Sequence, residues 1–357
     1  MKHSYLIFGI LLGCLFSACK PDFDLNAPYK DVTVVYGILN YQDPVHYIKI
    51  YKGFQSHETG GVYLDAQNPD SIYYNVGDID VVLKEYNNKG NLIQDIRMEA
   101  TNEHPKDEGI FYYDEKRIFY KTTKEIKKEN SYKIVITNKT GKVTESQGMT
   151  PIVGDFKIRG PLSIDMTADK ISMTFEKAPL ASDSCYEFIV KLRYFEVDKT
   201  TKQVVKEDSI TKVVATVGEY YEIEQNSGYN LKRFSATFYD DLAEKLVANP
   251  KVVRYIGTPE QSVYTPQKPI EIDGWAAGLS MKNYLLSNKP TSSYVQINTI
   301  YTNMQVTEGD GLAYGFFSSR VKSPTHACPT RGLSEDSLVY GYRTRHLGFR
   351  FRSEYHP

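Results

Sequence analysis

Apolar and polar residues alternate in short segments along most of this chain, and this alternation constrains the fold more than any other feature. In the segment 45–51, Ile48 and Ile50 lie on one side of an extended chain, and Tyr47 and Lys49 lie on the other. The same period of two recurs in the segments 79–84, 132–136 and 171–176. This period is typical of a β-strand with one buried face, so we expect a mainly β protein.

Turn-forming residues separate these segments at close spacing. Residues 87–90 and 138–141 each end in a glycine, Gly90 and Gly141, which supplies the positive φ of a tight hairpin. Tyrosine, which suits half-exposed strand faces, occurs 29 times against 16 Phe and a single Trp. Short strands joined by close turns are typical of antiparallel β-sandwiches. Residues 56–75 lack periodicity and hold glycines and a proline, so we expect a long loop there.

At 357 residues the chain is long enough for two domains of ~100–200 residues each. A turn-rich segment over residues 150–161 separates two groups of predicted strands. We therefore expect two antiparallel β-sandwich-like domains, an Ig-like N-terminal one over residues 31–152 and a C-terminal β-rich one over residues 153–357, with one or two short helices in the second. The four-residue spacing of Phe238, Leu242 and Leu246 predicts a helix near 238–248. Shorter elements are expected as a helix at 282–286 and strands at 111–113, 118–120 and 295–301.

The first nineteen residues have the pattern of an export signal. A short basic start precedes an apolar run over residues 5–16, which is near the ~7–15 residues of a signal core and short of the ~20 that span a bilayer. The small residues Ser17 and Ala18 then precede Cys19, and the chain becomes polar at once. This arrangement resembles a bacterial lipobox, in which the cysteine is acylated. We expect a signal peptide over residues 1–18, lipidation at Cys19 and a tether over residues 19–30.

Two alternatives to lipidation at Cys19 remain open. Cys14 also follows small and apolar residues, but cleavage there would leave Leu15 and Phe16 exposed, and charges begin only after Cys19. The other alternative is an ordinary secretory signal that contains an incidental cysteine.

The remaining residues match no pattern for catalysis or cofactor binding. Seven histidines are scattered without metal-ligand spacing, and neither a phosphate-binding glycine loop nor a nucleophile elbow is present. His326 and Cys328 are two positions apart, which would place both on one face if the segment were a strand, but a pair without further ligands is not a metal site. We expect no cofactor, no metal and no catalytic residues. The balance of 43 basic and 44 acidic residues gives no field that would favour nucleic acid.

Three further features have a structural and a functional interpretation. Cys185 and Cys328 remain after processing, and they either form one disulfide or stay as two buried thiols. Adjacent tyrosines at 73–74, 112–113 and 220–221 either pack on opposite faces of strands or present rings to a sugar. The basic tail, with Arg350 and Arg352 on one face, is either an edge strand or a patch for anionic groups.

Several of these segments, taken in order, resemble a known family. They are the lipobox, residues 34–38, a hairpin through Asp43-Pro44-Val45, the strands at 78–86 and 131–134, Thr150-Pro151, and the run 311–317. This order is similar to outer-membrane lipoproteins of Bacteroidota that share a domain of unknown function and accompany TonB-dependent transporters. The resemblance covers most of residues 19–320 and leaves out the tail from Val321.

The resemblance implies a non-enzymatic, lipid-anchored binding or accessory module of a TonB-dependent uptake system, with an outer-membrane transporter as partner. The family brings no catalytic residues. Asp22 and Asp24, just after the anchor, favour display on the cell surface over the periplasmic leaflet. Two other function classes stay open: an adhesin or fimbria-like structural subunit, and a glycan-acting hydrolase with unrecognised carboxylates.

Overall fold

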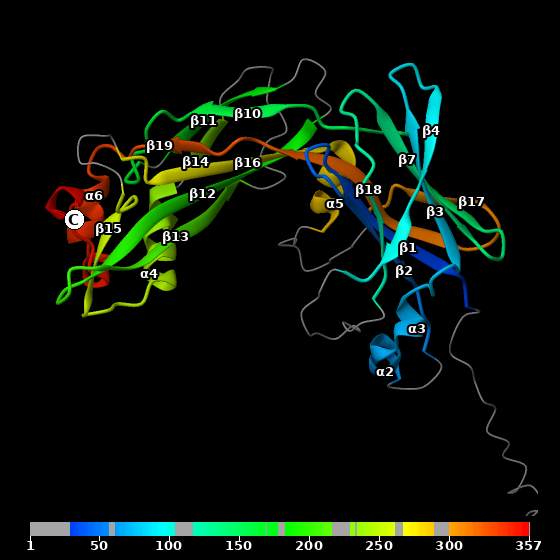
Figure 1. Cartoon of the computed structure of the whole chain (residues 1–357), viewed down its shortest axis with the longest axis horizontal. Helices are drawn as coiled ribbons and strands as arrows, with labels where there is room; N and C mark the ends of the chain where they lie inside the picture. The colour runs from blue at the N-terminus through cyan, green and yellow to red at the C-terminus, as the bar shows by residue number, and fades with distance from the viewer. Residues whose placement is uncertain are drawn as a thin grey trace, which may run out of the picture.

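A computed structural model of the chain shows two β-sandwich-like lobes that share one strand (Figure 1). The structure describes residues 29–56, 61–103, 117–168, 170–177, 183–215, 229–232, 234–260, 267–288 and 300–356. The predicted signal peptide, Cys19 and most of the tether lie outside these ranges. The predicted fold class, mainly β with antiparallel sandwich-like sheets, is confirmed.

The first lobe packs two sheets against each other. One sheet contains β1 (Val32–Leu39), β2 (His46–Lys52), β6 (Phe119–Thr122), β5 (Glu99–Thr101) and the first part of β18 (Leu312–Lys322). The other contains β17 (Met304–Glu308), β8 (Val143–Ser146), β7 (Ser131–Asn138), β3 (Ile79–Tyr86) and β4 (Leu92–Arg97), and β9 (Thr150–Pro151) joins it at β7. Alternate residues of each long strand are buried, so Val35, Ile48, Leu83 and Ile134 meet in one core.

The second lobe is a sandwich covered by helices. A small sheet of β10 (Phe156–Gly160), β11 (Lys170–Lys177) and β14 (Tyr229–Lys232) faces the long strands β13 (Val204–Ala215), β12 (Asp183–Asp198) and β16 (Ile270–Gly278). β15 (Val252–Ile256) pairs with β12, and β19 (His326–Cys328) pairs with β16. The core joins Phe175 and Phe188 of the two sheets to Leu242 of α4 (Phe234–Lys245) and Leu338 of α6 (Ser334–Tyr340).

β18 belongs to both lobes. Its residues 312–319 pair in parallel with β1, and residues 320–322 pair antiparallel with β16. Phe317 lies in the first core, and Val321, four positions on, lies in the second. β17 and the first part of β18 thus complete the lobe that residues 31–152 begin, while the domain division at residue 152 stays a prediction.

The local differences from the expected elements have local causes. The predicted loop 56–75 contains α2 (Val62–Gln67) and α3 (Pro69–Ile72); Asn68 caps α3 by accepting a hydrogen bond from the Asp70 amide, and Pro69 occupies its first turn. α4 begins four residues earlier than expected and ends at Lys245. α5 (Leu279–Ser287) contains the predicted short helix.

Three predicted strands differ or cannot be compared in full. Residues 118–120 fall at the start of β6, while 111–113 and 295–299 lie outside the described residues. The predicted edge strand of the tail is instead irregular, with a 3₁₀ turn at Arg352–Glu354. None of the helices in the described ranges is long and apolar enough to cross a membrane.

Candidate functional site

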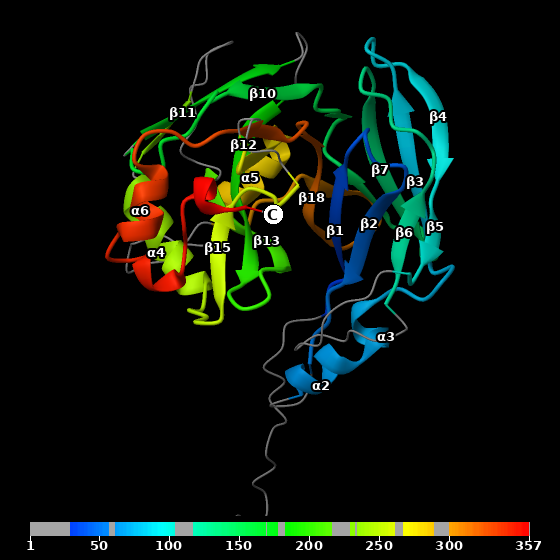
Figure 2. The ribbon, with the colours of Figure 1, turned by 60° about the vertical axis from the view of Figure 1, so that its left-hand side comes forward.

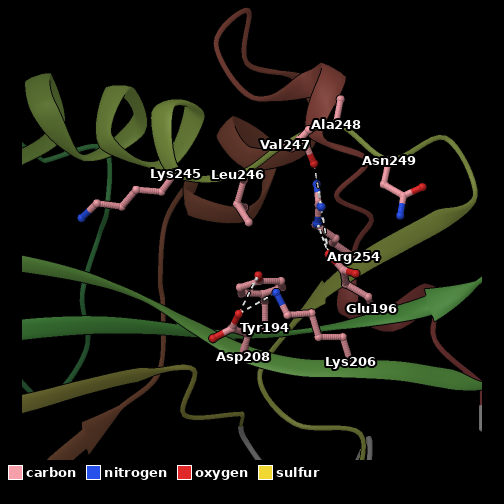
Figure 3. Close-up of a pocket in the computed structure, with 10 residues that line it drawn as sticks. All are labelled: Tyr194, Glu196, Lys206, Asp208, Lys245, Leu246, Val247, Ala248, Asn249 and Arg254. Carbon is pink, nitrogen blue, oxygen red and sulfur yellow. Dashed lines mark hydrogen bonds and ion pairs between the residues drawn. The ribbon is translucent and has the colours of Figure 1, made fainter. Parts of the chain in front are cut away.

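A groove of about 700 Å³ lies in the second lobe between the end of α4 and the large sheet. Figure 3 shows Tyr194, Glu196, Lys206 and Asp208 on the sheet below the segment that follows α4. Lys245, the last residue of α4, and the following residues 246–249 form the rim, and Arg254 of β15 lies at one end of the groove.

The rim is held in place by the way α4 ends. The Leu246 amide donates to the Leu242 carbonyl at 3.0 Å, and the Leu246 side chain is buried in the core. Asn249 then turns the chain, because its side-chain oxygen accepts a hydrogen bond from the Lys251 amide at 3.0 Å. The next residue is Pro250, which cannot continue a helix. Val247 is left in solvent, with 80% of the residue's surface exposed.

Arg254 joins three segments at the end of the groove. Its guanidinium pairs with the buried Glu196 carboxylate at 2.8–2.9 Å and donates to the carbonyls of Val247 (2.8 Å) and Leu347 (2.6 Å). Figure 3 shows the side chain extended between the sheet and the rim. A charge this deeply buried is tolerated when its donors are satisfied, as they are here by three partners. Arg254 therefore shapes the groove.

The polar groups that face the groove are Lys206, Asp208 and Tyr194. The Lys206 ammonium lies 2.7 Å from the Asp208 carboxylate, and this hydrogen bond raises the pKa of the lysine. The Tyr194 hydroxyl donates to Asp208 at 3.5 Å. Burial, and then the nearby Asp208, raise the pKa of Tyr194, so the phenol stays protonated at neutral pH. The groove thus offers a cation, an anion and a hydroxyl side by side, which suits a polar ligand without net charge.

A smaller hollow of about 390 Å³ lies where the ends of β12 and β15 meet the C-terminal tail. Phe195, Tyr255 and Tyr355 form an aromatic cluster beside it, with ring centroids 4.9–5.5 Å apart. The Arg352 guanidinium stacks over Tyr355 at 4.7 Å and Phe195 at 5.3 Å. Arg352, one of the tail's basic residues, therefore helps to fix the tail on the second lobe.

The candidate disulfide between Cys185 and Cys328 is not formed in the structure. Both thiols are buried and are not bonded to each other, and they lie beside opposite ends of β16, opposite Ala277 and Ile270 respectively. The two partner positions are seven residues apart on one strand, which is far beyond the reach of an S–S bond. Burial raises the pKa of the Cys328 thiol to about 11, so it is unreactive.

The other predicted candidates are placed as follows. His326 donates a hydrogen bond from its ring nitrogen Nε2 to the Pro161 carbonyl at 2.8 Å. No group of three metal-ligand side chains occurs among the described residues. Tyr73 and Tyr74 are both buried, and the Tyr74 hydroxyl bonds to the Thr33 hydroxyl at 2.8 Å. Cys19 and the tyrosines at 112–113 and 220–221 lie outside the described residues.

The groove was not predicted from the sequence. The alternation through Lys206 and Asp208 indicates that the two side chains share a strand face, and that was the only local signal. The rim and Arg254 follow Asp208 by 37 to 46 residues along the chain, so their position depends on the folded structure.

No protein-family model matches the chain, and no curated protein matches it. Among solved structures, the C-terminal globular domain of an oligosaccharyltransferase from Pyrococcus abyssi is similar at 12% identity and a TM-score of 0.23. That match covers 61% of this chain and 40% of the other. Trypsin-activated alpha-2-macroglobulin from Escherichia coli matches at 6% identity and a TM-score of 0.18, over 71% of this chain and 15% of the other. The chain thus spans less than half the length of each of these two structures.

Proposed function

We propose that this protein is a lipid-anchored, non-enzymatic binding or accessory module of a TonB-dependent outer-membrane uptake system, displayed at the cell surface. The observation that carries the proposal is the signal that ends at Ala18-Cys19 and is followed at once by polar residues. The resemblance to outer-membrane lipoproteins supplies the uptake system as the partner.

The charges around the groove support a binding role. Glu196 and Arg254 satisfy each other, and the remaining donors of Arg254 hold backbone carbonyls. Lys206, Asp208 and Tyr194 are left facing the groove as hydrogen-bonding groups. This arrangement suits the reversible recognition of a polar ligand or of a short segment of a partner protein.

Cell fractionation tests the anchor. We expect Cys19→Ala to move the protein from the membrane to the soluble fraction, while Cys14→Ala stays in the membrane, because only the acylated residue holds the chain there. Protease treatment of whole cells should degrade the wild-type protein if it is displayed at the surface. A Cys19→Ala variant that remains lipidated would contradict the choice of cysteine.

Purification from native membranes tests the partner and the groove together. We expect the wild-type protein to recover an outer-membrane transporter, and we expect Lys206→Ala combined with Asp208→Ala to recover less of it. The matched control is Arg159→Ala with Glu176→Ala, a similarly exposed ion pair on β10 and β11. Repeated recovery of no transporter by the wild type would overturn the proposal. Recovery of polymers of the protein itself would favour the fimbria-like alternative.

A further inference from the structure

One end of the first lobe exposes a group of large apolar side chains. Val62, Tyr63 and Leu64, which form the first turn of α2, are 59%, 59% and 70% exposed. Val76, in the turn before β3, is 70% exposed. Three consecutive exposed apolar residues are unusual on a surface that only faces water.

The contacts of α3 and the neighbouring strands place this group where the chain enters the lobe. The Tyr29 hydroxyl donates to the Gly53 carbonyl at 3.0 Å, so the first described residues lie against the end of β2. Lys52 at that end donates to the Asp70 carbonyl of α3, which holds the α2–α3 pair beside it. Figure 2 shows α2 and α3 together at the end of the lobe where β1 begins. Tyr29 is itself 53% exposed at this end of the lobe.

The charges at this end nearly balance. Lys139 lies 2.7 Å from Asp78, and Lys142 lies 2.9 Å from Asp31. The acidic Asp65 and Asp70 of α2 and α3 are matched in number by Lys30 and Lys52, so the surface combines exposed apolar side chains with little net charge. Such a surface is suited to neutral lipid and gives no particular attraction for anionic lipid.

The length of the preceding chain limits how far this end can lie from the membrane. Cys19 and Tyr29 are ten positions apart, and a fully extended chain spans at most ~3.6 Å per residue, or ~36 Å here. A lipid-anchored Cys19 therefore keeps the apolar end near the bilayer. This step rests on the anchor that is part of the proposed function.

We propose that the apolar end, defined by Tyr29, Val62, Tyr63, Leu64 and Val76, lies in the membrane interface and forms a second contact with the bilayer beside the lipid anchor. Tyrosine is suited to this depth, because its ring is apolar and its hydroxyl stays hydrated. The additional contact restricts the tilt of the molecule and directs the second lobe, with its groove, away from the lipid.

The experiment uses the full lipidated protein with an environment-sensitive fluorophore at a single new cysteine, Leu64→Cys. Cys185 and Cys328 are buried, so the label reacts at the new site. The matched control is Ile93→Cys, because Ile93 is 48% exposed and lies on β4, just after the hairpin at the far end of β3 from Val76. Each labelled protein is mixed with vesicles of phosphatidylcholine and phosphatidylethanolamine, and both flotation and emission are measured.

We expect both proteins to float with the vesicles and only the label at position 64 to shift to shorter wavelength. Flotation without any shift would overturn the inference and leave the anchor intact. Failure to float would contradict the anchor and the inference together. A shift at both positions, or a shift at 64 only when a membrane protein partner is added, would also overturn it.

A second measurement does not depend on the label. In the chain that lacks the acyl groups through Cys19→Ala, we expect Tyr63→Ser with Leu64→Ser to weaken vesicle binding about tenfold or more, since several buried CH₂ groups leave the lipid. Leu92→Ser with Ile93→Ser should leave binding unchanged. Equal binding by all three proteins would contradict the inference.

Discussion

At the scale of single residues, Arg254 shows how a buried charge can hold a site together. Removing its side chain leaves Glu196 buried without a counter-charge and two carbonyls without donors. We expect Arg254→Ala to lower the free energy of unfolding by ~3–5 kcal/mol, as measured by urea denaturation. Arg97→Ala is the control: its ion pair with Asp80 at 3.3 Å is exposed on both sides, so the cost should stay below ~1 kcal/mol. Equal decreases in the free energy of unfolding for the two variants would show that Arg254 does not hold the rim in place.

His46, another single residue, should make the first lobe sensitive to acid. Its side chain is buried at the start of β2, and burial lowers the pKa of the imidazole despite the nearby Asp43. The unfolded chain binds the proton more readily than the folded one. Stability is therefore full above the unfolded pKa of about 6.5 and falls as the pH drops towards the folded value, by at most ~1.4 kcal/mol per pH unit.

Urea denaturation at a series of pH values between 7.5 and 5 measures this dependence. We expect His46→Phe to flatten the loss of stability that occurs below about pH 6.5. An unchanged pH dependence in that variant would show that other groups cause the loss. We compare the slopes of the unfolding free energy against pH rather than the free energies themselves. The slope reports the proton effect alone, whereas a change in packing shifts the free energy at every pH.

At the scale of elements, the parallel pairing of β1 with β18 depends on Gly315. This glycine has φ +96°, and a Cβ there would lie 1.9 Å from the Val35 carbonyl oxygen of the paired strand. Gly141 also has positive φ, at +84°, but a Cβ there would meet nothing within 4 Å. We expect Gly141→Ala to cost ~1–2 kcal/mol of backbone strain. Gly315→Ala should lower the free energy of unfolding by ~2 kcal/mol more than Gly141→Ala does, because β1 and β18 must also separate. Equal midpoints of urea denaturation for the two variants would contradict this prediction.

The sequence predicts elements whose cause is local. The alternation at Ile79, Val81 and Leu83 predicts the buried face of β3, because the period of a strand does not depend on its partner. The capping pair Asn68-Pro69 was also a local signal for α3, although the glycines before it favoured a loop. The β1–β18 pairing could not be predicted in this way, since its strands are about 280 residues apart. The groove depends on contacts of the same kind.

At the scale of the whole molecule, β18 makes the two lobes structurally dependent. Phe317 is fully buried in the first core, and Val321 on the same strand is fully buried in the second. A strand cannot leave one core without disturbing the register of its pairs in the other, because residues 312–322 form one continuous element. The two lobes should therefore unfold together, although each has its own core.

The Cys328 thiol provides a probe of the second lobe alone, because it is buried in the core of that lobe and becomes reactive when the lobe opens. In the Cys19→Ala chain, we expect Phe317→Ala, which damages the first core by ~3–5 kcal/mol, to lower the urea concentration at which Cys328 reacts. Leu92→Ala, at an exposed position of the first lobe, should leave that concentration unchanged. If Cys328 of the Phe317→Ala variant stays protected to the original midpoint while the far-ultraviolet circular dichroism changes earlier, the lobes unfold independently and β18 serves only as a connection.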